Sequence, residues 1–191
     1  MTHDQLQMTQ DPDVALLERI AQGSEAALAE FYRSHESRVY AFALSRLRHE
    51  AEAAECLNEV MLEVWKHADR FEGRSKVTTW LLGIANHKVL DKLRRRGRYQ
   101  SEPVDDQMPD ESSAAMFDVL AGADDAEIIR LCLEGLSESH RQVIHLAFYE
   151  DMSYEDIAQV AGCPEGTVKT RVFHAKQRLK DCIATHTAGA G

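Results

Sequence analysis

Apolar residues recur at helical spacing along most of the chain. Val14, Leu17 and Ile20 lie three positions apart, and Gly23 after them is a typical helix stop. Ser24 can cap a second helix, whose apolar positions are Leu28, Phe31, Tyr32, Val39, Phe42, Ala43 and Leu47. No stretch shows sustained alternation of Val, Ile or Thr with polar residues. The pattern therefore predicts an all-α fold.

Two further helices complete this first helical block. The third has an apolar stripe at positions i, i+3, i+4, i+7 and i+8, formed by Leu57, Val60, Met61, Val64 and Trp65. The fourth begins near Thr78 or Thr79, and its apolar positions are Trp80, Leu81, Ile84, Ala85, Val89, Leu90 and Leu93. Because Trp65 and Trp80 share these stripes, we expect both to pack in the core rather than to stack on bases.

A second helical block begins at about Asp125. Its first two helices carry apolar residues at helical spacing: Ile128, Leu131, Cys132 and Leu136, then Val143, Ile144 and Ala147. Ser137 or Ser139 can cap the second of these helices. The chain is therefore predicted to contain two separate groups of helices.

Residues 153–180 have the pattern of a helix-turn-helix. Ser153 is a candidate N-cap, with Asp156 three residues later in an acidic variant of the capping box. Gly162 can end this helix in the left-handed conformation, and Pro164 suits the first position of the next helix. A short helix, a turn of about three residues and a second helix form the unit that many DNA-binding proteins use.

The second helix of this motif has a basic outer side. Its inner side is set by Val168, Val172, Ala175 and Leu179, which leaves Lys169, Thr170, Phe173, His174 and Gln177 facing outward. A helix in the major groove contacts base edges with its N-terminal half, while nearby cations bind phosphates. Lys169 and Arg171 can reach guanine or phosphate oxygens, and Gly166 keeps the first turn slim. An ordinary solvated surface helix is the alternative, but the cap, the turn and the basic face together favour DNA binding.

The distribution of charge matters more than the formal net charge of -10. Residues 88–98 contain six cations and one acid, and residues 166–180 contain five cations and no acid. Residues 101–127 contain nine acids and no Lys or Arg. Two basic patches are thus compatible with phosphate binding in an acidic chain. For residues 88–98 alone, a solvated helix end is an equally good interpretation.

The acidic segment separates the two helical blocks. It has two prolines, several serines and only scattered large apolar residues, which is typical of a solvated linker, and a short helical turn fits residues 116–120. We therefore predict a first domain over residues 13–98, a linker over residues 99–124 and a second domain over residues 125–183.

Other kinds of chemistry find little support. The cysteines form no C-x-x-C pair, so we expect reduced, partly buried thiols at Cys56, Cys132, Cys163 and Cys182. The nine histidines show no ligand spacing with them, so we expect neither a metal nor another cofactor. No nucleophile–base set or Gly-rich phosphate loop is present, so we predict that the chain is not an enzyme. It has no secretory signal and no apolar run of about 18 residues, which favours a cytoplasmic protein without membrane contact.

Four segments of the chain carry a family resemblance. They are ALLERIAQGSEAALAEFYRSHESRVY, AECLNEVMLEVWKHADRFEG, TTWLLGIANHKVLDKLRRRGR and LSESHRQVIHLAFYEDMSYEDIAQVAGCPEGTVKTRVFHAKQRL, in this order. Together they resemble a bacterial RNA polymerase sigma factor of the sigma-70 family, in the small two-domain extracytoplasmic function group. The resemblance covers about residues 14–98 and 125–182.

This resemblance implies three groups of functional residues. The first domain resembles sigma region 2, whose contact with core polymerase would include Glu55, Asn58, Glu59, Met61 and Glu63. Its contact with the -10 promoter element would include Arg74, Ser75, Lys76, Thr79, Asn86, His87, Lys88, Asp91, Arg94 and Arg95. The second domain resembles sigma region 4, whose reader of the -35 element would include Gly166, Thr167, Lys169, Thr170, Arg171, Phe173 and His174.

The resemblance also implies partners. We expect a sigma factor that binds the β′ clamp and β subunits of RNA polymerase core, recognises the -35 element, and recognises and melts the -10 element of promoter DNA. An anti-sigma factor would control it, in a stress response. Two alternatives remain at this point. One is a stand-alone helix-turn-helix regulator that binds an operator as a dimer, and the other is an all-helical adaptor whose basic patches bind an acidic protein.

Overall fold

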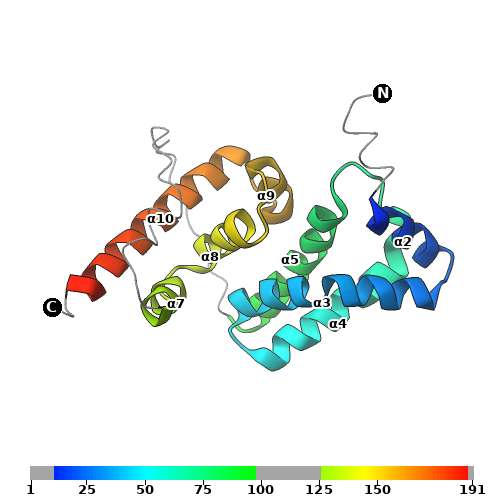
Figure 1. Cartoon of the computed structure of the whole chain (residues 1–191), viewed down its shortest axis with the longest axis horizontal. Coiled ribbons are helices and arrows are strands. Elements are labelled where there is room, and N and C mark those ends of the chain that lie inside the picture. The colour runs from blue at the N-terminus through cyan, green and yellow to red at the C-terminus, as the bar shows by residue number, and fades with distance from the viewer. Residues whose placement is uncertain (1–10, 98–125, 189–191) are drawn as a thin grey trace. The chain divides into compact units, whose positions relative to one another are not determined.

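The computed structural model of the chain describes residues 11–97 and 126–188, and the regular structure within these ranges is entirely helical (Figure 1). The predicted all-α class is thereby confirmed. The chain divides into two compact units, Met1–Gln100 and Ser101–Gly191. The predicted linker over residues 99–124, with its short turn at residues 116–120, lies outside the described residues.

The first unit is built around one long helix. Its elements are α2 (Pro12–Ala21), α3 (Glu25–Leu47), α4 (Glu50–His67), the 3-10 helix η1 (Ala68–Arg70) and α5 (Val77–Arg95). Helix α3 packs against α2, α4 and α5, and α4 also packs against α5 (Figure 1). The contact between α4 and α5 brings the segments predicted to bind polymerase and promoter DNA next to each other.

Local signals in the sequence set the helix starts of this unit. The hydroxyl of Ser24 accepts a hydrogen bond from the Ala27 amide at 3.2 Å and caps α3, as predicted. Gly23 before it has φ +85, the left-handed conformation that glycine adopts without steric cost. The carboxylate of Asp11 caps α2 in the same way, at 3.0 Å from the Asp13 amide.

The core of the first unit follows the predicted apolar stripes. Phe31, Phe42 and Leu81 of these stripes are fully buried, and Leu82, which the prediction did not include, is buried with them. Each such side chain contributes about 1.5–3 kcal/mol relative to an exposed one. The tryptophans are an exception to the predicted core. Trp65 and Trp80 are both only partly buried, since each lies at the edge of its stripe.

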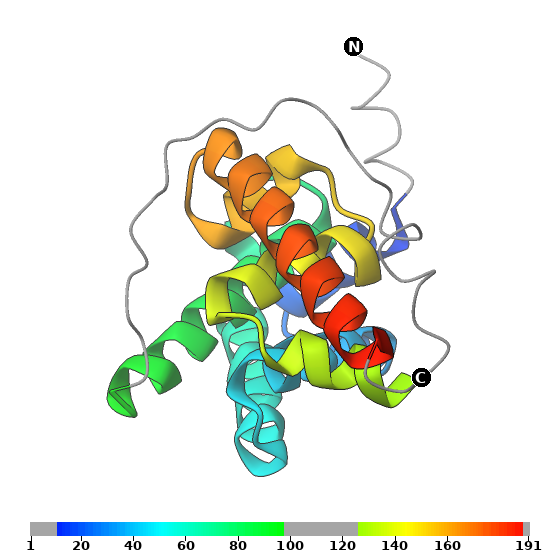
Figure 2. The ribbon, with the colours of Figure 1, turned by 90° about the vertical axis from the view of Figure 1, so that its left-hand side faces the viewer.

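The second unit is built around its last helix. Its elements are α7 (Ala126–Glu134), α8 (Glu138–Ile144), the π-helix η2 (His145–Tyr149), α9 (Tyr154–Ala161) and α10 (Glu165–Ala188). Helix α10 packs against α7, α8 and α9, and Figure 2 shows it in orange and red crossing the other helices of this unit. The packing leaves one side of α10 available to a partner.

Two predictions for the second unit need correction. Leu131 was predicted to lie on the apolar face of the first helix, but it is 48% exposed. Cys132 is the residue of α7 that is buried in the core. The second helix was predicted to hold Ala147, but α8 ends at Ile144 and the backbone widens into η2. Ser137 caps α8, with its hydroxyl 3.4 Å from the His140 amide.

Candidate nucleic-acid interface

Helices α9 and α10 form the predicted helix-turn-helix. The Ser153 hydroxyl accepts a hydrogen bond from the Asp156 amide at 3.1 Å and donates one to the Asp156 carboxylate at 2.8 Å. Gly162 ends α9 with φ +64, which confirms its predicted left-handed conformation. Pro164 lies one residue before α10, where its carbonyl accepts a hydrogen bond from the Thr167 amide at 3.0 Å. The turn therefore fixes the start of α10 against α9.

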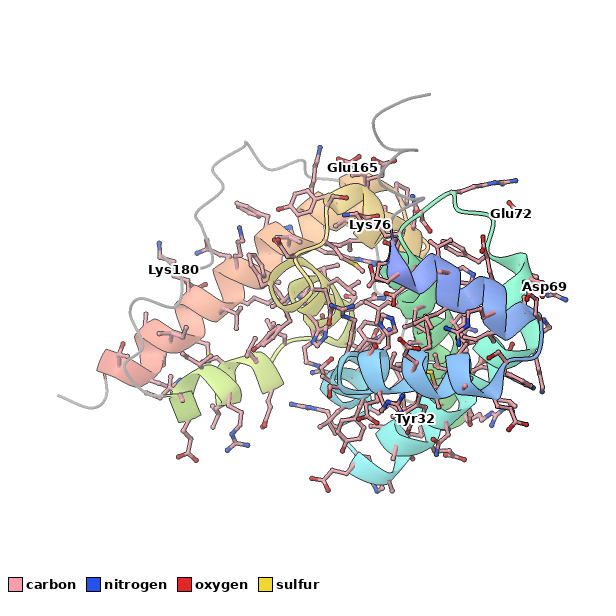
Figure 3. The ribbon with its side chains drawn as sticks, turned by 45° about the vertical axis from the view of Figure 1, so that its right-hand side comes forward. Tyr32, Asp69, Glu72, Lys76, Glu165 and Lys180 are labelled. Atoms are coloured by element: carbon pink, nitrogen blue, oxygen red, sulfur yellow. A yellow bond between two sulfur atoms is a disulfide. The ribbon has the colours of Figure 1, made fainter. Side chains whose placement is uncertain are left out.

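The outer side of α10 is polar and basic. Glu165, Lys169, Phe173, Gln177 and Lys180 are all exposed, and Figure 3 shows Glu165 and Lys180 far apart along this helix. The Lys169 ammonium lies 3.0 Å from the Glu165 carboxylate, and both side chains are about half exposed. Such an exposed ion pair contributes about 0–1 kcal/mol. A phosphate or a base edge can therefore take the place of Glu165 as the partner of Lys169.

Two threonines of the predicted interface are turned inward. Thr167 and Thr170 are only 9% and 7% exposed, and the Thr170 hydroxyl donates to the carbonyl of Gly166 at 3.1 Å. The prediction that Thr170 faces outward was therefore wrong. Its hydroxyl takes the backbone acceptor one helical turn earlier, which is a common use of Thr inside a helix.

The remaining predicted residues of α10 lie at the side of its outer face. Arg171 is half-buried and donates to the sulfur of Cys163 in the turn at 3.7 Å. His174 is also half-buried, with its ring at 5.4 Å edge-on to Phe173. Burial raises the pKa of the Cys163 thiol. The Cys163 thiol is therefore neutral, and its contact with Arg171 does not cancel the positive charge of the guanidinium.

In the first unit, the loop before α5 presents several of the predicted DNA-binding side chains. Arg74 and Lys76 are exposed and Ser75 is half-buried. The Arg74 guanidinium lies 2.6 Å from the Glu72 carboxylate, with side chains 84% and 60% exposed. Figure 3 shows Glu72 and Lys76 on this loop. The loop is held to α5 by the edge-on contact between Phe71 and Trp80, at 5.5 Å.

Further along α5 the predicted DNA-binding residues divide into an exposed and a buried set. His87, Asp91, Arg94 and Arg95 are exposed. Thr79 and Asn86 are only 3% and 2% exposed. The amide oxygen of Asn86 accepts a hydrogen bond from the guanidinium of Arg46, which is itself buried. In this structure Thr79 and Asn86 thus belong to the interior of the unit and do not face solvent.

Across the contact between α4 and α5, acids pair with cations in a ladder. The pairs are Glu63 with Lys88 at 3.1 Å, Glu59 and Glu55 with Lys92 at 2.9 and 2.7 Å, and Glu52 with the Arg96 Nε atom at 2.9 Å. We call these side chains the α4–α5 ladder. Sequence reasoning did not find it, although acids recur every three or four residues on α4 and cations every four residues from Lys88 on α5 to its C-cap Arg96. That matched spacing in two antiparallel helices was the available signal.

The ladder shifts the pKa values of its members. Hydrogen bonding to Lys92 lowers the pKa of Glu55, and hydrogen bonding to Lys88 lowers the pKa of Glu63. Burial by itself would lower the pKa of Lys92, but its hydrogen bonds to Glu55 and Glu59 outweigh burial and raise that pKa. All three groups therefore stay charged around neutral pH. Three of the six cations of residues 88–98, namely Lys88, Lys92 and Arg96, are paired with acids of α4.

The outer side of α4 is the surface predicted to bind polymerase. Glu55 and Asn58 are exposed, and Glu59 and Glu63 are half-buried at the border of the ladder. Met61 is only 4% exposed, so its predicted surface contact does not fit its place in the core. Leu62, which the sequence did not single out, is 49% exposed between these acids. Single exposed apolar side chains are common on protein surfaces, so Leu62 alone does not identify a docking surface.

One of the expectations about cysteine was wrong. Cys132 and Cys182, which are 50 residues apart in the sequence, form a disulfide with their Cα atoms 5.8 Å apart. The packing of α7 on α10 brings them together, and no local spacing could reveal this. Cys56 and Cys163 are free thiols, as expected.

Comparisons with protein families match both units. The Sigma-70 region 2 family matches residues 31–99, and the Sigma-70 region 4 family matches residues 126–179. Within the part of the chain that the structure describes, no helix has the length and apolar character needed to cross a membrane.

Individual relatives give the same picture. The ECF RNA polymerase sigma factor SigK of Mycobacterium tuberculosis is 31% identical over 177 residues, which cover 88% of this chain and 92% of that protein. The ECF RNA polymerase sigma factor RpoE of Cereibacter sphaeroides is 31% identical over 157 residues, covering 82% of this chain and 86% of that protein.

Two solved structures are also similar. In the complex of the sigma factor RpoE with the anti-sigma factor NepR from Bartonella quintana, the matching chain has a TM-score of 0.61 and 26% identity, covering 81% of this chain and 97% of that chain. The structure of CnrH with the cytosolic domain of CnrY matches with a TM-score of 0.64 and 20% identity, covering 92% and 99%. The second likeness concerns the fold alone.

Proposed function

This chain belongs to the extracytoplasmic function group of the sigma-70 family of RNA polymerase sigma factors, and we propose that its two units read the two elements of a promoter. As a sigma factor it directs RNA polymerase to its promoters. A stand-alone regulator does not account for the region 2 match of the first unit, so this alternative falls. Sigma factors act by binding, and we infer that this chain likewise works in the cytoplasm without an enzymatic activity of its own.

The second unit would bind the -35 element through α10. The observation that carries this proposal is the turn at Gly162, which joins the capped helix α9 to α10. It leaves Gly166 and Lys169, in the first two turns of α10, exposed to solvent. Lys169 and Arg171 would contact base edges or phosphates, with Gly166, Phe173 and His174 beside them. Thr167 and Thr170 would hold the helix start in place from inside.

The first unit would bind and open the -10 element with the exposed part of its predicted set. Arg74, Ser75 and Lys76 on the loop and His87, Asp91, Arg94 and Arg95 on α5 are the residues that reach solvent. The cations would bind the phosphates of the separated strand. Thr79 and Asn86 would shape this surface from beneath. Lys88 would contribute only after leaving Glu63, at 3.1 Å.

The outer side of α4 would bind core polymerase. Glu55, Asn58, Glu59 and Glu63 offer acidic and polar groups, and Leu62 at 49% exposure adds an apolar anchor. Acids of this kind would pair with a basic surface of the β′ clamp. The second unit would meet the β subunit when holoenzyme places it over the -35 element.

An anti-sigma factor would control the protein by covering these surfaces. The support for this is the similarity to the sigma factor in the complex with NepR. A partner that covers α4 would compete with core polymerase, since both would use Leu62 and the acids around it. The remaining alternative, an adaptor for an acidic protein, predicts no promoter preference.

Transcription with purified core polymerase tests this proposal. Templates would carry the promoter of the protein's own operon, and run-off transcripts would be measured for the unchanged chain and for Lys169→Ala with Arg171→Ala. If the two side chains read the -35 element, each loss should cost about 1–3 kcal/mol of promoter affinity. The transcript should therefore fall at least tenfold at limiting protein.

A matched control uses cations on the same helix outside its first turns. Lys180→Ala with Arg178→Ala removes the same charge and should leave promoter choice unchanged. Equal loss in both double variants would indicate a general effect of charge and would contradict base reading by Lys169 and Arg171. Absence of any specific transcript with the unchanged chain would contradict the proposal as a whole.

A further inference from the structure

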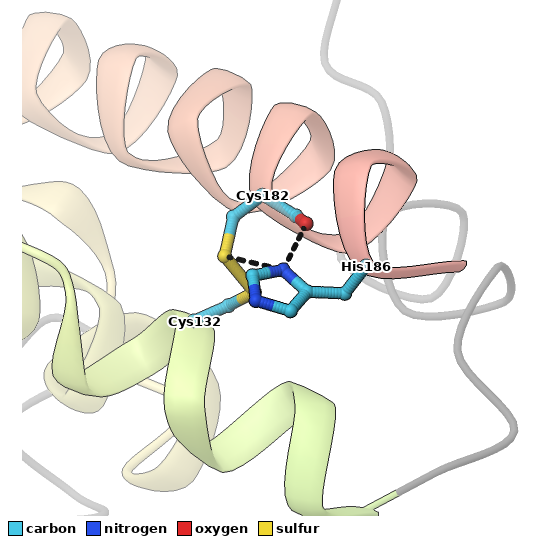
Figure 4. A group of neighbouring side chains, drawn as sticks. All are labelled: Cys132, Cys182 and His186. Atoms are coloured by element: carbon cyan, nitrogen blue, oxygen red, sulfur yellow. Dashed lines mark hydrogen bonds between the residues drawn. A yellow bond between two sulfur atoms is a disulfide. The ribbon is translucent and has the colours of Figure 1, made fainter. Parts of the chain in front are cut away.

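Three metal-ligating side chains meet where α7 packs on the C-terminal part of α10. Cys132 comes from α7, and Cys182 and His186 come from α10 (Figure 4). Their sulfur and ring nitrogen atoms all lie within 4.8 Å of one another. No metal site was predicted from the sequence. The four-residue spacing of Cys182 and His186 was the available signal, whereas Cys132 is 50 residues away from Cys182.

The fold holds this group in place from two sides. Cys132 is 2% exposed and belongs to the apolar core of the unit, together with Leu136, Leu179 and Ile183. On α10, Cys182 and His186 are four residues apart and so lie on one side of the helix. The His186 Nδ1 atom lies 2.9 Å from the carbonyl oxygen of Cys182 and 3.8 Å from its sulfur. The imidazole thus lies beside the sulfurs, with its Nδ1 atom nearer to the carbonyl oxygen than to the sulfur.

The donor atoms fit one class of metal ion. Two cysteine thiolates and one imidazole nitrogen are typical ligands of Zn²⁺, which binds sulfur and nitrogen in tetrahedral sites. In the disulfide the two sulfurs are bonded to each other and carry no thiolate charge. In a reducing compartment, however, exchange with dithiols opens disulfides that are accessible to them.

We propose that Cys132, Cys182 and His186 form a Zn²⁺ site when the disulfide is reduced, so that a disulfide or a metal ion joins α7 to α10. A dithiol supplies two electrons and two protons and becomes a disulfide itself, while the Cys132–Cys182 bond breaks to give two thiols. Zn²⁺ then displaces one proton from each thiol and binds the two sulfurs and the imidazole. Hydrogen peroxide takes two electrons from the thiolates and two protons from solvent, its O–O bond breaks to give two water molecules, the disulfide forms again and the zinc ion is released.

The geometry requires only small movements. Zinc–sulfur bonds of about 2.3 Å in a tetrahedral site hold two sulfurs about 3.8 Å apart. Cα atoms 5.8 Å apart allow this separation by rotation of the two side chains, without moving the helices. His186 is exposed, so the fourth position of the ion faces solvent and takes a water molecule. The site goes beyond promoter recognition and does not depend on it.

Cobalt substitution tests the site directly. The full chain would be reduced with a phosphine, freed of reductant and titrated with Co²⁺ in the absence of oxygen. We expect one equivalent to give thiolate-to-cobalt charge-transfer absorption and the intense visible bands of tetrahedral cobalt, and Zn²⁺ to displace it. The oxidised chain should show neither. Zn²⁺ should also raise the melting temperature of the reduced chain but not that of the oxidised chain.

Single substitutions test which side chains bind the metal ion. Cys132→Ser and Cys182→Ser should each abolish the charge-transfer absorption, while Cys163→Ser should retain it. Because Cys132 is buried, its variant can lose structure, so His186→Gln at an exposed position gives an independent measure. It should weaken cobalt binding at least tenfold with unchanged helical circular dichroism. No cobalt spectrum in the reduced chain, or a spectrum that survives His186→Gln and Cys182→Ser unchanged, would overturn the proposal.

Discussion

The ammonium group of Lys92 on α5 lies 2.7 Å from the carboxylate of Glu55 on α4. Glu55 belongs to the surface proposed to bind polymerase, and Lys92 lies on α5, the helix whose exposed residues are proposed to bind promoter DNA. The two surfaces are therefore fixed to each other through the α4–α5 ladder. Arg74, Lys76, Arg94 and Arg95, which are proposed to bind promoter DNA, are exposed and lie outside the ladder.

Replacing Lys92 should destabilise the first unit. Lys92→Met keeps the length of the side chain but removes the donor shared by Glu55 and Glu59, and the Lys92 side chain is only 9% exposed. We expect the free energy of unfolding to fall by about 1 kcal/mol at neutral pH. Chemical denaturation measures it. Arg94→Met, at a side chain that is 60% exposed, is the matched control and should change stability by less than about 0.5 kcal/mol.

The destabilisation by Lys92→Met should depend on pH in a defined window. The pKa of Glu55 is lowered from 4.5 in the folded chain, so its contribution is present above pH 4.5 and is lost as the pH falls through the lowered value. The pKa of Lys92 is raised from 10.5, so its contribution is present below pH 10.5 and is lost as the pH rises through the raised value. A difference between variant and parent that keeps its neutral-pH size as the pH falls well below 4.5 would contradict the ladder.

Replacing Asn86 should lower the stability of the first unit, and any effect on promoter binding should follow from that loss. Asn86→Ala removes the amide that accepts from Arg46, and both side chains are 2% exposed. We expect a loss of about 1–3 kcal/mol in stability, because a buried charged donor loses a partner. Exposed His87→Ala next to it should leave the melting temperature unchanged. Reduced promoter binding by Asn86→Ala without any loss of stability would show that Asn86 contacts DNA directly.

Replacing the two glycines of the helix-turn-helix, Gly162 and Gly166, by alanine should change the stability in opposite directions. Gly162 has φ +64 and no atom within 4 Å of an added Cβ, so Gly162→Ala is opposed by backbone strain alone. We expect it to lose about 1–2 kcal/mol of stability. Gly166 also has open space but lies in the first turn of α10 with a helical backbone, so Gly166→Ala should gain about 0.5–1 kcal/mol. Thermal unfolding of the two variants checks the difference in sign.

Cys56 should be chemically inert in the folded chain. Burial raises the pKa of its thiol to about 12, so the reactive thiolate is nearly absent at pH 8. We expect iodoacetamide to modify Cys163 at least about a hundredfold faster than Cys56. Mass spectrometry of peptides after timed quenching measures both rates. If iodoacetamide modified Cys56 and Cys163 at similar rates in the absence of denaturant, the buried position of Cys56 would be contradicted.

Features controlled by a few neighbouring residues were predictable from the sequence. Ser24 and Ser153 cap their helices because, in the first turn of a helix, the N-cap hydroxyl lies close to the amide three residues later. Gly162 adopts the left-handed conformation for an equally local reason. The spacing of Val168 and Leu179 identified the inner side of α10, since a helix has a fixed period.

Features that depend on tertiary register were not predictable in the same way. Thr170 has a hydroxyl that could contact a base, yet this hydroxyl donates a hydrogen bond to the carbonyl of Gly166 within the helix. The pairing of Lys92 with Glu55 requires the offset between α4 and α5, which no single helix contains. The disulfide between Cys132 and Cys182 needs the packing of α7 on α10.

Binding of a labelled promoter fragment tests the central claim most directly. The fragment would carry the promoter of the protein's own operon and would be titrated with the chain alone, with core polymerase alone and with both. We predict a salt-resistant complex that distinguishes this promoter from a scrambled one only when chain and core are both present. Equal selectivity by the chain alone, or no selectivity with core present, would contradict the assignment of this protein as a promoter-specificity factor.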